Sequence, residues 1–199
     1  MMVLLETSED LAVASAEIGM PCGQLVSLAR FADRGTTFGI DNGFYAHSDP
    51  DGFLRRVKGC EPYRERCKFV VVPDVVGSAR RTLELFERWA PRLEGWPLAL
   101  AIQDGQEDLP IPWDAGIKAV FIGGTTAFKM SFAAETCIRA AQGLGLWTHV
   151  GRVNTPSRMT RFEDIGVDSC DGTGISRFSW MRKGIADRKL QPALLEGNA

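Results

Sequence analysis

FVVVPD (residues 69–74) and LALAIQDG (residues 98–105) decide the fold class, because each places a short apolar run directly before polar residues. Continuous apolar runs of four or five residues are typical of parallel strands that are buried on both faces. The same pattern recurs, in stronger or weaker form, at residues 119–122 (AVFI), 147–150 (WTHV), 37–40 and the short segment before Asp171. The sequence therefore predicts at least six strands of a parallel sheet.

Amphipathic segments between these strands carry the residues that start and stop helices. Thr155 followed by Pro156 is typical of a helix start, and Gly166 is typical of a helix end. Three further helices are expected: residues 79–90 after a Ser78 cap, residues 131–142, and one that begins at Ser48 or Asp51. Strands that alternate with helices indicate βαβ units.

Two α/β architectures fit this alternation, a closed TIM-like (β/α) barrel and an open doubly wound sheet. The chain lacks a G-x-G-x-x-G motif after a strand, which weighs against a dinucleotide-binding sheet. The barrel is therefore favoured. Because 199 residues is short for eight complete units, missing or irregular units are expected.

The composition excludes disordered, fibrous and membrane-spanning classes. The chain is 45% hydrophobic and 24% charged, and it contains no run of 18 apolar residues. Its first ten residues, MMVLLETSED, lack the basic and apolar regions of a signal peptide. These features predict a single domain over residues 1–199, located in the cytoplasm with no membrane partner.

The five cysteines fit neither a disulfide framework nor a zinc motif, and reduced thiols are expected. Only Cys60 and Cys67 lie close together in sequence. Charge is distributed unevenly, since residues 151–189 contain eight basic and five acidic residues. This basic part could contact phosphate groups, although charge alone favours a solvated surface of mixed charge.

Polar residues follow nearly every predicted strand. In a barrel the carboxyl ends of the strands converge on one pocket, so these segments would face one another. They are Asp41-Asn42-Gly43, Pro73-Asp74, Gln103-Asp104-Gly105, Gly123-Gly124, Gly151-Arg152 and Asp168 to Asp171. Single aspartates after strands are commonly turn formers, but six polar strand ends in register indicate a functional site.

Several kinds of chemistry fit such a pocket. Two carboxylates suit N-glycosidic cleavage, in which one attacks the anomeric carbon and the other moves the proton. An aspartate, a glutamine and glycine amides suit recognition of a purine edge. Two aspartates could instead bind Mg²⁺. A dyad of Cys170 and His149 is a further alternative, although His149 is better explained as a core histidine inside an apolar run.

The order of these strand ends resembles that of the tRNA-guanine transglycosylases and their short phage and bacterial DNA-modifying relatives. Ile40 to Phe44 (IDNGF) is similar to the D-S-G-G-F segment of the family, and Gly166 to Asp171 (GVDSCD) is similar to G-I-D-M-F-D. The resemblance implies that Asp41 is the general acid/base and that Asp171 is the covalent nucleophile. It leaves Asp168 as a candidate either for substrate binding or for a supporting, structural role.

The resemblance also implies which residues bind the base. Asp74 after VVVP and Gln103 in AIQDG match the positions that read the guanine edge, and Gly123-Gly124 matches the glycine pair whose backbone contacts the base. The matches extend over residues 40–171. Asn42 and Arg152 are further candidates for substrate contact. The implied chemistry requires neither a metal ion nor a redox cofactor.

The chain departs from the family by lacking its zinc subdomain, because no cysteine or histidine follows Asp171. This favours DNA over tRNA as the substrate of a guanine to 7-deazaguanine exchange. Family members often form dimers, so a homodimer is one expected assembly. The alternatives are an N-glycosidase of a nucleoside or nucleotide and a non-catalytic module that binds nucleic acid or a nucleotide.

A polymer substrate needs contacts to its phosphates, which usually come from arginine and lysine. Five candidates lie around and after the proposed nucleophile: Arg152, Arg158, Arg177, Arg182 and Lys183. Lys129, after the glycine pair, is another candidate. Trp180 is better explained by packing than by stacking on a base.

Overall fold

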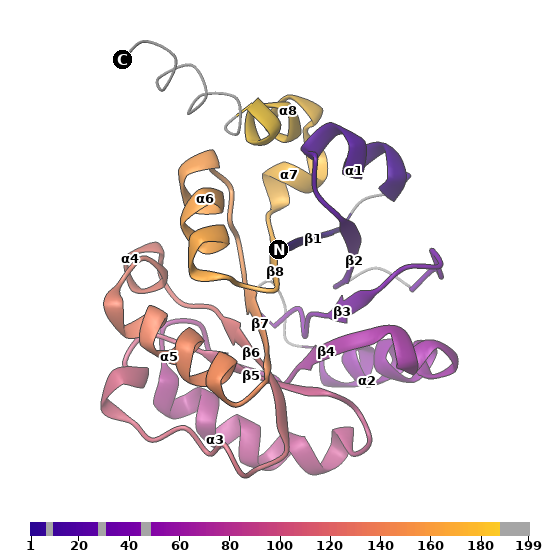
Figure 1. Cartoon of the computed structure of the whole chain (residues 1–199). Helices are drawn as coiled ribbons and strands as arrows, with labels where there is room; N and C mark the ends of the chain where they lie inside the picture. The colour runs from indigo at the N-terminus through magenta and orange to yellow at the C-terminus, as the bar shows by residue number, and fades with distance from the viewer. Residues whose placement is uncertain (7–9, 28–30, 45–48, 188–199) are drawn as a thin grey trace.

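Eight parallel strands form a closed barrel in the computed structural model, which describes residues 1–6, 10–27, 31–44 and 49–187. Each strand pairs with the next along the chain, and the last pairs with the first (Figure 1). The strands are β1 (Met2–Leu5), β2 (Cys22–Val26), β3 (Phe38–Ile40), β4 (Cys67–Val71), β5 (Leu98–Ile102), β6 (Ile117–Ile122), β7 (Trp147–Val150) and β8 (Ser169–Asp171). The prediction of a TIM-like barrel is confirmed, and the open sheet is excluded.

Helices cover the outside of the barrel. They are α1 (Leu11–Ile18), α2 (Pro50–Gly59), α3 (Ala79–Trp89), α4 (Thr126–Lys129), α5 (Phe132–Gly143), α6 (Pro156–Ile165), α7 (Thr173–Arg177) and α8 (Ser179–Asp187), with 3₁₀ turns η1 (Glu61–Arg66), η2 (Ala90–Leu93) and η3 (Gln106–Asp108). The described residues between β2 and β3 contain no helix, and the connection from β5 to β6 contains only η3. Irregular units are therefore present, as expected from the short chain.

The predicted helix ends agree closely in position with the structure except at α2, although Ser78 at the start of α3 makes no capping hydrogen bond with its side chain. Thr155 accepts a hydrogen bond from the Arg158 N–H at the start of α6, and Gly166 ends that helix with φ of 81°. The cap of α2 is Asp49, whose Oδ1 accepts from the Gly52 N–H at 2.9 Å. The expected start at Asp51 is therefore wrong, and Ser48 lies outside the described residues.

Alternating residues of the strands separate two apolar layers. The inner cluster fills the barrel with Leu4, Leu25, Phe69, Val71, Ala99, Ala101 and Ala119. In β5, Leu98, Leu100 and Ile102 face the other way and join the larger cluster beneath the helices. The LALAI sequence thus places alanines inside the barrel, where space is short, and larger side chains outside it.

Arg182 of α8 joins the end of the barrel to α1. Its guanidinium is buried, pairs with the Glu17 carboxylate at 2.5 Å and donates to the Ile175 carbonyl of α7 at 3.0 Å. The expectation that Arg182 contacts phosphate is wrong, because its donors are directed inward. Instead, Arg182 ties together three helices near the carboxyl end of β8 (Figure 1).

We expect Arg182→Met to lower the free energy of unfolding by about 2 to 4 kcal/mol, since it leaves a buried carbonyl and Glu17 without their charged donor. Arg177→Ala, at an exposed position on the neighbouring helix, should change it by less than about 0.5 kcal/mol. Urea titration of both variants measures the difference. Equal stabilities would show that the buried contact is not important for the fold.

Candidate active site

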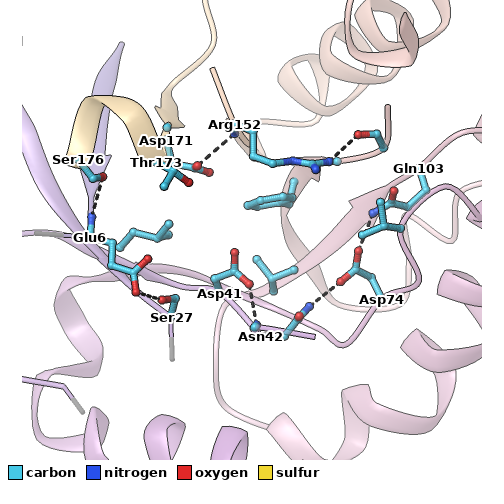
Figure 2. Close-up of a pocket in the computed structure, with 18 residues that line it drawn as sticks. Glu6, Ser27, Asp41, Asn42, Asp74, Gln103, Arg152, Asp171, Thr173 and Ser176 are labelled. Atoms are coloured by element: carbon cyan, nitrogen blue, oxygen red, sulfur yellow. Dashed lines mark hydrogen bonds between the residues drawn. The ribbon is translucent and has the colours of Figure 1, made fainter. Parts of the chain in front are cut away.

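A pocket of about 240 Å³ opens at the carboxyl ends of the strands (Figure 2). Eight of the nine predicted site residues line it, namely Asp41, Asn42, Asp74, Gln103, Gly123, Gly124, Arg152 and Asp171. They come from β3 to β8, so residues up to 130 positions apart in the chain share one cavity. The convergence inferred from the strand ends is therefore present.

Asp74 is held at one end of the pocket by two amide side chains. Its Oδ1 accepts from Asn42 Nδ2 at 2.7 Å, and its Oδ2 accepts from Gln103 Nε2 at 2.5 Å. The amide of Gln103 is oriented by the Gly77 N–H, which donates to Gln103 Oε1 at 3.0 Å. Burial raises the pKa of Asp74, while its amide donors and the charge of Arg152 oppose that rise.

Asp41 lies in the middle of the pocket, directly after β3. Its Oδ1 accepts from the Gly43 N–H at 2.7 Å. Burial raises the pKa of Asp41 to about 7, and the negative charges of Asp171 and Asp74 add to the rise against the effect of Gly43. A carboxyl group with this pKa can both give and take a proton at neutral pH.

Asp171 ends β8 and has a donor on each carboxylate oxygen. The backbone N–H of Arg152 donates to Oδ1 at 3.1 Å, and His149 Nε2 lies 3.0 Å from Oδ2. The side chain is only 11% exposed, on the side that faces the pocket. Arg152 is the one described residue other than glycine with positive φ, 60°, a conformation that strained backbones adopt at functional sites.

The side chain of Arg152 crosses the pocket toward the glycine pair, where its guanidinium donates to the Gly124 carbonyl at 2.7 Å (Figure 2). The Gly123 N–H donates to the Ile102 carbonyl at 2.9 Å, so the expectation that both glycine amides hold a base is wrong for Gly123. Gly123 is needed at this position because it has no side chain. A Cβ there would lie 2.5 Å from Gln103 Nε2 and would displace that amide.

Asp168 does not belong to the pocket. It precedes β8, and its Oδ2 accepts from the N–H and the hydroxyl of Thr148 at 2.8 and 2.7 Å. The substrate-binding role expected for Asp168 is therefore wrong, because its carboxylate holds the lower parts of β7 and β8 together. Asp171 lies three residues further along, at the end of β8 that opens to the pocket.

Two other contacts that the sequence left open are excluded by strand direction and burial. Cys170 Sγ contacts Met159 Sδ of α6 on the outside of the barrel, so Cys170 cannot form a dyad with His149 inside it. Lys129 is buried and donates to the Gly151 carbonyl at 2.7 Å. Burial, aided by the charge of Arg152, lowers the pKa of Lys129 to about 8. Lys129 therefore supports the Gly151 turn and does not contact phosphate from the surface.

Other basic residues retain their accessibility. Arg177 and Lys183 are exposed on α7 and α8, and Arg158 is half-buried on α6. Arg188 and Lys189, which belong to the basic part of the sequence, lie outside the described residues. Trp180 is 68% exposed and stacks against the exposed ring of Phe178, with ring centroids 6.0 Å apart.

Sequence reasoning missed the opposite end of the pocket. Glu6 follows β1 and Ser27 follows β2, and the Ser27 hydroxyl donates to the Glu6 carboxylate. Ser176 Oγ accepts from the Glu6 N–H at 3.1 Å, and Thr173 completes this wall. The signal was available in MVLLE at residues 2–6, an apolar run followed by an acid, but the first two strands were not recognised.

Within the described ranges, no three His, Cys, Asp or Glu side chains are grouped as ligands of one metal ion. All five cysteines are free, and burial raises the pKa of Cys60 to about 12. A helix long and apolar enough to cross a membrane is also absent from the part of the chain that the structure describes.

Comparison with known proteins supports the fold and goes no further. No family model matches the chain, and no curated protein matches it in sequence. A mandelate oxidase variant with an FMN adduct has a TM-score of 0.54 at 15% identity, covering 98% of this chain and 72% of that one. A chain of a designed cube-shaped protein cage has a TM-score of 0.50 at 13% identity over 98% and 73%. The native KDPGal structure has a TM-score of 0.49 at 12% identity over 97% and 96%.

The raised pKa of Asp41 predicts how stability depends on pH. Folding favours the protonated form of Asp41, so its contribution is fully present below pH ~4 and is lost as the pH rises through about 7. Asp41→Asn should therefore become more stable relative to the native protein between pH 5 and pH 8. Urea unfolding of both proteins at the two pH values measures this change.

Asp104→Asn provides a control of opposite sign. Burial acts to raise the pKa of Asp104, but hydrogen bonds from Thr125 lower it overall. The contribution of Asp104 to stability is therefore lost only as the pH falls below ~4. The stability difference for Asp104→Asn should stay constant from pH 5 to pH 8. A constant difference for Asp41→Asn as well would contradict the raised pKa.

Proposed function

We propose that this protein is a base-exchanging glycosyltransferase that replaces guanine in nucleic acid with a 7-deazaguanine, with DNA favoured over tRNA. The proposal rests on two groups of side chains that share one pocket. It holds two carboxyl groups suited to breaking a glycosidic bond, Asp41 and Asp171, beside a cluster suited to a purine edge, formed by Asp74, Asn42 and Gln103.

The two carboxyl groups support a double displacement in which Asp171 is the nucleophile. In the first half, an Asp171 oxygen forms a bond to the anomeric carbon while the bond to the base breaks, and protonated Asp41 gives its proton to the leaving base. In the second half, Asp41 takes the proton of the incoming base, whose nitrogen attacks the anomeric carbon and releases Asp171. One glycosidic bond replaces another, and Asp41 ends protonated as it began.

The Asp74 cluster supports recognition of guanine in particular. The edge of guanine presents N–H donors beside a carbonyl acceptor, and Asp74 is a half-buried acceptor next to the amide donor of Gln103. Val71, Val76 and Phe121 line the rest of the pocket and offer apolar surface to a flat ring. A base bound in this way is held by its edge, which leaves its seven-position free to differ between the outgoing and incoming bases.

Uptake of a labelled 7-deazaguanine by guanine-containing DNA or RNA, followed by mass spectrometry, tests the activity. Asp171→Asn should lower product formation by a factor of about 10³ or more, because the nucleophile is lost. Asp168→Asn is the matched control, since it makes the same change to a carboxylate that lies outside the pocket, and it should retain activity. Absence of label uptake by the native protein with DNA, RNA and free nucleotides would refute the transferase.

Two other results would each replace the proposal by one of its alternatives. Release of free guanine without label uptake would identify a hydrolase, since the same two carboxyl groups serve with water as acceptor. Undiminished nucleic-acid affinity in Asp171→Asn, together with an inactive native protein, would identify a binding module.

A polymer substrate predicts phosphate contacts on the exposed basic residues near the pocket. Neutralising Arg177 and Lys183 together should reduce the slope of log K against log salt by about one to two units. Neutralising Arg81 and Arg88 on α3, on the outer side of the barrel, should leave the slope unchanged (Figure 1). Filter binding over a range of salt concentrations measures both. Equal slopes for the two double variants would remove the electrostatic support for a polymer.

A further inference from the structure

Four side chains inside the barrel form a series of hydrogen bonds that ends at the proposed nucleophile. Trp147 Nε1 donates to Ser169 Oγ at 2.8 Å, Ser169 Oγ lies 2.8 Å from His149 Nδ1, and His149 Nε2 lies 3.0 Å from Asp171 Oδ2. The residues alternate on two paired strands, β7 and β8, in which His149 is in register with Ser169. All four side chains therefore project into the same interior.

The donors and acceptors of this series fix where the protons lie. The carboxylate of Asp171 can only accept, so the hydrogen of its contact with His149 lies on Nε2. An indole N–H can only donate, so Ser169 Oγ accepts from Trp147, and its own hydrogen can be donated to His149 Nδ1. A protonated imidazolium would also donate from Nε2.

Packing holds the imidazole in this orientation. The ring of His149 is fully buried, with its centroid 4.8 Å from the ring of Phe121 and 4.8 Å from that of Phe69. A Cβ on Gly39 or Gly151 would collide with one of these two rings, so the glycines leave space for the stack. The imidazole can therefore turn only by displacing its neighbours.

A serine, a histidine and an aspartate in series could suggest a hydrolytic triad, but accessibility excludes that interpretation. Ser169 and His149 are 0% exposed and do not line the pocket, whereas Asp171 does. A substrate in the pocket can therefore reach only the carboxylate. Ser169 and His149 therefore orient Asp171, whereas in a hydrolytic triad the aspartate and histidine would activate the serine.

We propose that His149 is a positioning residue that aims the Asp171 carboxylate, with Ser169 and Trp147 setting its tautomer. The Nε2–H of His149 holds Oδ2 and the Arg152 backbone N–H holds Oδ1, so the plane of the carboxylate is fixed toward the pocket. The catalytic consequence rests on the proposed function, in which Asp171 attacks an anomeric carbon. Loss of such an orienting donor costs reaction rate rather than substrate affinity.

Two amide substitutions of His149 separate positioning from packing. The nitrogen of glutamine reaches the place of Nε2, whereas that of asparagine reaches only the place of Nδ1. We expect His149→Asn to lower kcat by a factor of about 10 to 100 with KM changed less than about threefold. His149→Gln should recover most of that loss, because it restores a donor to Asp171.

An ¹⁵N spectrum of the histidine ring tests the hydrogen bonds in the native protein, independently of activity. The chain contains only His47 and His149, so the signal lost in His149→Gln is assigned at once. The expected spectrum shows protonated Nε2 and unprotonated Nδ1, or both nitrogens protonated if the ring is cationic.

The outcomes distinguish this inference from the proposed function. An unprotonated Nε2, or equal kcat for the native protein and a folded His149→Asn, would overturn the role of His149. Native protein that shows protonated Nε2 but no base exchange on any substrate would refute the proposed function, and the catalytic role of His149 with it, while the proton arrangement would stand.

Discussion

The parallel pairing of β8 with β1 closes the barrel, and the contents of the pocket depend on this closure. Leu4 is in register with Asp171, so Glu6 emerges from β1 beside the segment that follows β8. The Glu6 N–H then meets Ser176 across the seam. In an open sheet, β1 and β8 would lie at different places, and the pocket would lose one wall.

Closing the barrel also brings several carboxyl groups into one cavity. The surrounding residues reduce the electrostatic repulsion between them in several ways. Asp74 is surrounded by neutral amide donors, Asp171 receives a donor on each oxygen, and Asp41 retains a proton up to a pH of about 7. The guanidinium of Arg152 lies over this acidic cavity, so its positive charge lowers the pKa of Asp74 from the value that burial alone would set. The same arrangement places the three carboxyl groups in three different surroundings, which suit the separate roles that the proposed exchange assigns to Asp74, Asp171 and Asp41.

Most of the pocket could be predicted from the sequence because its residues directly follow apolar runs. Asp74 after FVVV, Gln103 after LALAI and Asp171 before Gly172 lie where a parallel barrel must expose them. Glu6 and Ser27 were missed because β2 contains glycine and glutamine, which weaken its apolar pattern, and β1 was not recognised without a partner. A strand is hard to recognise when its burial comes from the closed barrel and not from its own composition.

The charge of a single residue did not predict whether its side chain lies at the surface or in the interior. Arg182 belongs to a basic segment, yet an ion pair with Glu17, distant in sequence, holds it in the interior. His149 was expected to be a core histidine with satisfied nitrogens, and it is one. Its contact with Asp171 follows from the register of β7 and β8, which single-strand patterns do not contain.

The proposed base exchange requires that Asp171 forms a covalent bond to the sugar. Rapid quenching of the protein with guanine-containing DNA, followed by proteolysis and mass spectrometry, tests this most directly. Such a bond predicts a sugar adduct on Asp171 within the tryptic peptide over residues 162–177, and its absence in Asp171→Asn. Base exchange without an adduct on Asp171, or an adduct on another residue of the pocket, would contradict it.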